Sequence, residues 1–183
     1  MRISRLSWRV LLHRARKNLN KPGRLPRIAC LGVGNELNGD DVAGLRVVRF
    51  LKQINIPAEI CLLLETGPSP ENFTAPVTRF APDWVLVVDA ARMQAQPGRI
   101  AYAGLAEVAG VSAFTHGLPL SMLGEYLVAE TGCQFGLLGI QVVQTGFGVP
   151  LSAAVERAAG RLGRELAALF TQDQRELNPL AGH

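Results

Sequence analysis

The sequence IACLGVGNELNGDDVAG, residues 28–44, sets the architecture expected for this chain. Its first six residues form an apolar run that is typical of a buried strand, and a glycine-rich turn follows them directly. After Asp40 and Asp41 the apolar residues recur at helical spacing as far as residue 51. A buried strand, a glycine-rich turn and a helix at 41–51 indicate the first unit of an α/β fold.

The same alternation of short apolar runs and helical periodicity continues along the chain. The further strands that apolar runs predict lie at 59–64, 84–88 and 135–143, and the pattern permits a short one at 99–102. The further helices that the periodicity predicts lie at 69–80, 118–130 and after Pro150. The helix at 69–80 must be interrupted or restarted at Pro76. Strands that alternate with helices predict a single α/β domain with a mostly parallel sheet, covered by helices on both faces.

Length and composition limit the chain to one compact domain. At 183 residues, with 48% hydrophobic and 19% charged residues, it can fill one core but is too short for two ordinary domains. Its longest apolar runs are far shorter than the roughly 20 residues of a membrane span, and no signal peptide is visible. Cys30, Cys61 and Cys133 have no C-x-x-C spacing, which favours buried thiols over disulfides or a zinc site. We therefore expect a cytoplasmic protein without a transmembrane segment.

The first 26 residues differ in character from the rest and are expected to form a basic N-terminal extension. Residues 1–27 contain nine Lys or Arg and no acid, which leaves ten basic and fifteen acidic residues, a net charge of −5, in 28–183. This acidic balance removes the main support for a nucleic-acid partner. The extension is expected to be flexible or a separate amphipathic helix with few core contacts. An α/β domain at 27–175 and a tail at 176–183 are expected to follow it.

The glycine-rich turn also permits a dinucleotide-binding interpretation. In that interpretation its first two glycines receive a pyrophosphate and Glu65 binds the ribose. Two details oppose it, because the third glycine of the motif falls on Leu37 and because Asp40 and Asp41 stand where the helix should attract phosphates. Capping the helix is the ordinary role of an Asp at this place, and one of the two acids can serve that role alone.

Three side chains that can hold a metal ion are expected to meet at the carboxyl ends of the parallel strands. Asp41 follows the first strand, Asp89 ends the apolar run 84–88, and His116 is the one histidine between residues 14 and 182. Ligands bind outside the carboxyl ends of such strands. A carboxylate at 89 can instead bond loop amides, and a lone histidine is more often structural than a ligand. Together, two carboxylates and an imidazole indicate an open metal site.

Several segments of the chain match, in order, the motifs of one family. The matching segments are GNELNGDDVAG at 34–44, GPSPEN at 67–72, VVDA at 87–90, THGLPL at 115–120 and LGIQ at 138–141. In these segments the chain resembles the hydrogenase maturation proteases, whose opening motif is a strand followed by G-N-x-x-x-G-D-D/E-G-x-G. The T-H-x-x-P-L wording is similar to the branch that serves formate-hydrogenlyase-type hydrogenases. Val42 departs from the motif, and it would be strained if the usual glycine has a positive φ.

Carried over by motif, the resemblance implies that Asp41, Asp89 and His116 contact a metal and act in catalysis, with Asp40 as a helix cap or a support for them. It implies an endopeptidase that removes the C-terminal extension of a nickel-iron hydrogenase large-subunit precursor after nickel insertion. The precursor then supplies the nickel, and no organic cofactor is required. Whether this metal or a carboxylate activates the attacking water stays open. Two other hypotheses are a non-enzymatic nickel-binding or docking protein for hydrogenase assembly and a nucleotide-binding α/β protein.

Overall fold

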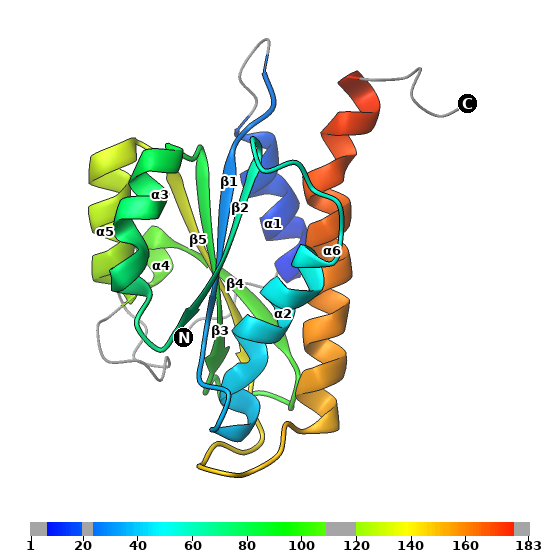
Figure 1. Cartoon of the computed structure of the whole chain (residues 1–183). Helices are drawn as coiled ribbons and strands as arrows, with labels where there is room; N and C mark the ends of the chain where they lie inside the picture. Colours follow the sequence, from blue (N-terminus) through cyan, green and yellow to red (C-terminus); the bar gives the residue numbers. More distant parts are fainter. Residues whose placement is uncertain (1–6, 20–23, 109–119, 178–183) are drawn as a thin grey trace.

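A five-stranded sheet forms the centre of the molecule (Figure 1). The structure, a computed structural model, describes residues 7–19, 24–108 and 120–177. The strands are β1 (Ile28–Val33), β2 (Cys61–Gly67), β3 (Trp84–Ala91), β4 (Ile100–Gly104) and β5 (Gln134–Gln141). They lie in the order β2-β1-β3-β5-β4; all neighbouring pairs are parallel except β4 with β5. β1 and β3 lie inside the sheet and every residue in them is buried, which explains their unbroken apolar runs.

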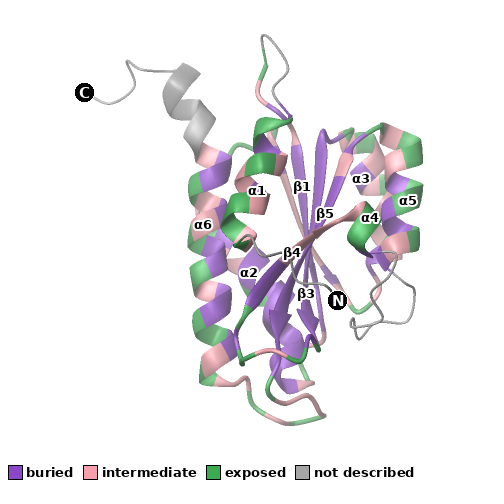
Figure 2. Cartoon of the chain, turned by 180° about the vertical axis from the view of Figure 1, so that it is seen from behind, coloured by how far each residue is buried: buried purple, intermediate pink, exposed green. Residues whose placement is uncertain are grey.

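Helices cover both faces of this sheet (Figures 1 and 2). One face carries α1 (Trp8–Lys17), α2 (Ala43–Lys52) and α6 (Ala153–Leu177). The other carries α3 (Thr74–Phe80), α4 (Leu105–Val108) and α5 (Leu120–Thr131). Two short 3₁₀ helices, η1 (Gly39–Val42) and η2 (Pro70–Phe73), precede α2 and α3. None of the helices in the described ranges is long and apolar enough to cross a membrane.

Alternate residues of the strands fill two separate cores. In β3, Trp84, Leu86 and Val88 face the core under α1, α2 and α6, whereas Val85 and Val87 face the core under α3, α4 and α5. This alternation follows from the two-residue period of a strand. In Figure 2 most strand residues are purple, that is buried, whereas the helices that cover the sheet also carry green, exposed residues. The predicted fold class, a single α/β domain with a mostly parallel sheet covered on both faces, is confirmed.

The element boundaries differ from those predicted in a few places. β1 has the predicted bounds, while the second strand lies at Cys61–Gly67 instead of 59–64, and the short α4 was not predicted. The interruption at 69–80 is real, because η2 ends at Phe73 and α3 restarts at Thr74. Pro76 falls in the first turn of α3, where a missing amide proton costs no helical hydrogen bond.

The expectation that the N-terminal extension makes few contacts with the domain is wrong. Its amphipathic helix forms as α1, and Leu12 of that helix is fully buried in the core that it shares with α2 and α6. Two polar contacts reinforce this packing, because Glu165 of α6 accepts from Arg9 Nε at 2.9 Å and lies 3.2 Å from His13 Nε2. The apolar stripe of α1 therefore packs on the domain although basic residues flank it. At the other end, α6 continues through Leu177, and residues 178–183 lie outside the described residues.

Candidate functional site

Two buried carboxylates lie at the carboxyl ends of adjacent strands. Asp41 is part of η1, the turn of helix that follows β1, and only 5% of its surface is exposed. Asp89 lies near the end of β3 and is fully buried. β1 and β3 are hydrogen-bonded neighbours with Gly32 opposite Val88, and η1 also contacts β3. The structure therefore brings Asp41 and Asp89 to the same edge of the sheet, as their positions after two apolar runs predict.

A close contact between backbones places η1 against β3. Gly44, in the first turn of α2, sits so near the strands that an added Cβ would lie 2.2 Å from the Val88 carbonyl oxygen and 2.3 Å from that of Val33. Such a contact has no room for any side chain, so this position requires glycine. The nearby Val42 has φ −72° and ψ −5°, an ordinary helical conformation, and it is not strained. The departure of Val42 from the family motif thus leaves the turn intact.

Asp40 has a different role from the helix cap that the sequence suggests. Its fully buried carboxylate accepts hydrogen bonds from the backbone amides of Val143 (2.7 Å), Gln144 (3.1 Å) and Ser152 (2.7 Å), and from Ser152 Oγ (3.0 Å). Neither η1 nor α2 receives a side-chain cap. Asp40 therefore ties η1 to the loop between β5 and α6 and holds the neighbouring Asp41 in place.

Asp89 points to the face of the sheet that α3, α4 and α5 cover, because it shares the strand alternation of Val85 and Val87. Its Oδ1 accepts from the amide of Ala90 at 2.7 Å, and the residue opposite it in β5 is Gly139, which has no side chain. Helix α5 covers the same face of the sheet.

His116, the third residue of the predicted site, lies outside the described residues. Helix α5 ends close to the start of β5, and its 12 residues run back about 18 Å toward the carboxyl edge of the sheet, where Leu120 begins it. His116 precedes Leu120 by four residues, which span at most about 14 Å when fully extended. Within the described ranges no three His, Cys, Asp or Glu side chains are grouped to hold a metal.

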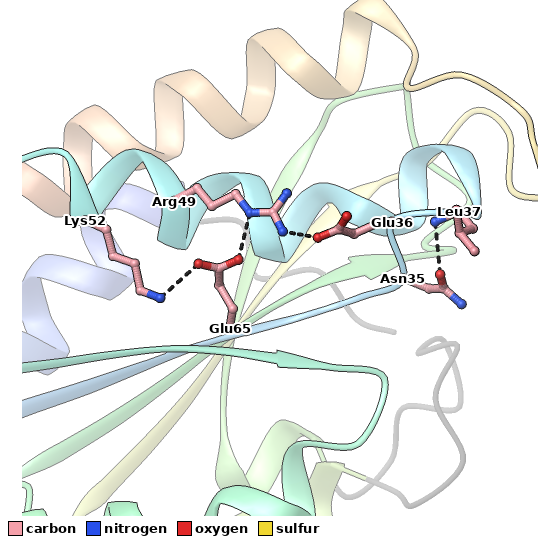
Figure 3. A network of polar contacts seen from close by, with 6 residues as sticks. All are labelled: Asn35, Glu36, Leu37, Arg49, Lys52 and Glu65. Atoms are coloured by element: carbon pink, nitrogen blue, oxygen red, sulfur yellow. Dashed lines mark hydrogen bonds and ion pairs between the residues drawn. The ribbon is translucent and has the colours of Figure 1, made fainter.

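An open cleft of about 590 Å³ lies at the same edge, between the turns that follow β1 and β2. Its lining includes Gly34, Glu36, Leu37, Arg49 and Glu65. Figure 3 shows the ion pairs on its wall: Arg49 of α2 donates to Glu36 and, at 2.7 Å, to Glu65 of β2. These pairs fasten the turn after β1 to α2 and β2.

Glu65 is occupied by this network. Lys52 Nζ donates to its second oxygen at 2.8 Å, and hydrogen bonds from Lys52 and Arg49 hold the pKa of the Glu65 carboxyl below its usual value despite partial burial. A carboxylate whose two oxygens already bind cations is poorly placed to bind a ribose, which weakens the dinucleotide hypothesis. Sequence reasoning missed Arg49 and Glu36 as part of this wall, because their pairing depends on how α2 lies against the turn.

Comparisons with known proteins agree on one family. The family model described as hydrogenase maturation protease matches residues 45–168. A protein of Methanocaldococcus jannaschii named as a hydrogenase maturation protease is 30% identical over 84% of this chain and 94% of its own length. The hydrogenase 3 maturation protease of Escherichia coli K12 is 31% identical over 70% of this chain and 81% of its own length. These matches span both sides of the sheet and most of the domain.

Solved structures give the same result. The crystal structure of a nickel-iron hydrogenase maturation protease, HycI of Thermococcus kodakarensis, superposes with a TM-score of 0.75 at 31% identity, covering 81% of this chain and 95% of the other. The solution structure of the endopeptidase HycI of Escherichia coli superposes with a TM-score of 0.67 at 26% identity, covering 78% and 90%. Fold and relatives together define this chain as an α/β endopeptidase. It belongs to the hydrogenase maturation protease family.

Proposed function

We propose that this endopeptidase removes the C-terminal extension of a nickel-iron hydrogenase large-subunit precursor, in the cytoplasm, after nickel has been inserted. Membership of the hydrogenase maturation protease family supports the reaction class, and relatives carry the names of hydrogenase 3 and nickel-iron hydrogenase maturation proteases. The nickel is part of the substrate, and the reaction requires no organic cofactor. The observation that carries the proposal is the pair of buried carboxylates, Asp41 and Asp89, on adjacent strand ends.

Asp41, Asp89 and His116 are the residues that we assign to contact the substrate's nickel and to act in cleavage. Two buried carboxylates at one edge of the sheet supply the oxygen donors that a divalent cation binds, and a bound cation stabilises their charge. An imidazole completes a set of oxygen and nitrogen donors that suits a borderline metal such as nickel. Four positions separate His116 from Leu120, the first residue of α5, and α5 covers the face of the sheet on which Asp89 lies.

This arrangement makes cleavage conditional on the metal. A precursor that carries nickel presents a cation to the two carboxylates, which positions the neighbouring peptide bond for attack by water. The water oxygen bonds to the peptide carbonyl carbon, the C–N bond breaks, and a proton passes to the leaving amine. A precursor without nickel lacks the group that the site recognises and is not held in that position.

The test is a direct assay of cleavage with two forms of the precursor. The protein is incubated separately with nickel-loaded and with metal-free large-subunit precursor, and the masses of the products are measured. We expect one defined loss of mass in the nickel-loaded precursor only. Binding of the nickel-loaded precursor without any loss of mass would favour the docking-protein hypothesis, and equal cleavage of both forms would contradict the recognition of nickel.

A further inference from the structure

Three exposed apolar side chains lie on loops beside the candidate site. Six large hydrophobic residues are exposed within the described ranges, and three of them, Leu37, Val143 and Phe147, belong to the turn after β1 and the loop after β5. Their exposed fractions are 59%, 53% and 82%. Exposed apolar groups that gather at one place mark interaction surfaces, because covering them removes apolar area from water. We call these three residues the apolar rim.

The two loops that carry the apolar rim are joined by hydrogen bonds. The Gly148 amide, next to Phe147, donates to the Leu37 carbonyl at 2.8 Å, and the Asp40 amide donates to the Gln144 carbonyl at 3.1 Å. The Asp40 carboxylate also accepts from the amide of Val143 at 2.7 Å. A surface that is fixed in this way loses little conformational freedom when a partner binds it.

We propose that the apolar rim is the docking surface for an apolar patch on the large-subunit precursor. This inference rests on the proposed function and adds a contact outside the cleaved bond. The position of the rim identifies its occupant, because Leu37 precedes Asp41 by four residues in the same turn and also lines the cleft. A protein whose scissile bond reaches Asp41 and Asp89 therefore passes directly over these loops.

The chemistry of the rim suits a protein partner. Aromatic side chains are enriched among the residues that contribute most to interfaces, and Phe147 is the most exposed of the large hydrophobic residues described. The polar wall of the cleft, with Glu36 and Arg49, lies next to Leu37 and can form the rim's hydrophilic border. Contacts away from the reacting bond increase the affinity of an enzyme for the substrate that carries them.

The experiment measures steady-state cleavage of nickel-loaded precursor by the wild type, by the double variant Leu37→Ser/Phe147→Ser and by the conservative variant Phe147→Leu. Tyr126→Ser is the matched control, because Tyr126 is 48% exposed on α5 and lies outside the rim. We expect KM to rise about tenfold in the double variant, with kcat within about twofold of the wild type. Tyr126→Ser should keep KM close to the wild-type value, and Phe147→Leu, which stays apolar but loses the aromatic ring, should raise KM less than the double variant does.

Three results would overturn the inference while leaving the proposed function in place, since the wild type still cleaves. The first is an unchanged KM in a double variant that melts at the wild-type temperature. The second is an equal rise of KM in Tyr126→Ser. The third is loss of a dimer of this chain in the double variant without a change in KM, which would make the rim a contact between copies. If the wild type itself does not cleave the precursor, the proposed function fails first.

Discussion

Asp40 and Ser152 are joined by two hydrogen bonds although 112 positions separate them in the chain. Asp40 Oδ1 accepts from the Ser152 amide at 2.7 Å, and Oδ2 accepts from Ser152 Oγ at 3.0 Å. Ser152 directly precedes the first residue of α6, so this contact fixes the start of the longest helix against the turn that carries Asp41. Asp40, the first of the two acids in the family motif, therefore has a structural role in this protein: it connects η1 to the start of α6.

Replacing Asp40 should destabilise the fold, and this should hold even for Asp40→Asn, which keeps the shape of the side chain. Both carboxylate oxygens accept from backbone amides, so an Asn would turn one NH₂ group toward an N–H donor and leave that buried donor without an acceptor. We expect a loss of about 1–3 kcal/mol in the free energy of unfolding, measured by urea denaturation. Ser152→Ala, which removes only the hydroxyl, should cost about 1 kcal/mol. An unchanged free energy of unfolding in Asp40→Asn would show that the Asp40 carboxylate does not hold η1 against the loop between β5 and α6.

Leu12→Ala should show that α1 is part of the folded domain. Leu12 is fully buried against the core of α2 and α6, and truncating a buried leucine removes apolar area and leaves a cavity. We expect a loss of about 2–5 kcal/mol in the free energy of unfolding. Val10 lies on the same helix but is 40% exposed, so Val10→Ala should change stability by less than about 0.5 kcal/mol. Similar effects in both variants would mean that α1 does not pack specifically.

The contact of α1 with α6 should weaken in acid. Burial raises the pKa of Glu165, but hydrogen bonds from Arg9 and His13 outweigh it and lower the pKa below the ordinary 4.5. A carboxyl with a lowered folded-state pKa stabilises the fold above its unfolded value and loses that contribution as the pH falls through the folded value. The difference in stability between wild type and Glu165→Gln should therefore shrink as the pH drops below about 4.5. A difference that stays constant or grows in that range would contradict the assignment.

The cysteines should be unreactive in the folded protein. Burial raises the pKa of Cys61 to about 12 and that of Cys30 well above its usual value, and Cys133 is buried as well. Because the thiolate is the reactive form, its fraction at Cys61 is reduced on the order of a thousandfold relative to a thiol of pKa 9.0. Labelling with a thiol reagent at pH 8 should be slow in the native protein and rapid in denaturant. Fast stoichiometric labelling of the native protein would contradict this burial.

Much of the fold could be predicted from local patterns, and β1 shows why. Its apolar run is buried on both faces and ends at a glycine-rich turn, so both bounds are visible in the sequence. The second strand was predicted to end at Leu64, before the polar Glu65 and Thr66. In the structure Thr66 is buried with its hydroxyl bonded to the Gly32 carbonyl at 3.0 Å, and Glu65 pairs with Lys52. Tertiary partners thus let polar residues continue a strand.

The features that the sequence did not predict depend on residues far away along the chain. The charge of the N-terminal extension suggested a solvated segment, yet Glu165 lies where it can bind Arg9 and His13, and Leu12 fills a core position. Likewise, the partners of Asp40 come from residues more than 100 positions later, which no local pattern shows. The positions of Asp41 and Asp89 were predictable because the carboxyl ends of neighbouring parallel strands meet at one edge.

The most direct test of the proposed site is the mass of nickel-loaded precursor after incubation with Asp41→Asn, Asp89→Asn and His116→Ala, each compared with wild type. Asn keeps the shape of Asp but loses the charge that attracts the metal, and Ala removes the imidazole. Glu125→Gln, which removes an exposed charge on α5, is the control. We predict that wild type and Glu125→Gln remove the extension, while the three site variants leave the precursor mass unchanged although they remain folded. Wild-type cleavage rates in all three site variants would contradict the account.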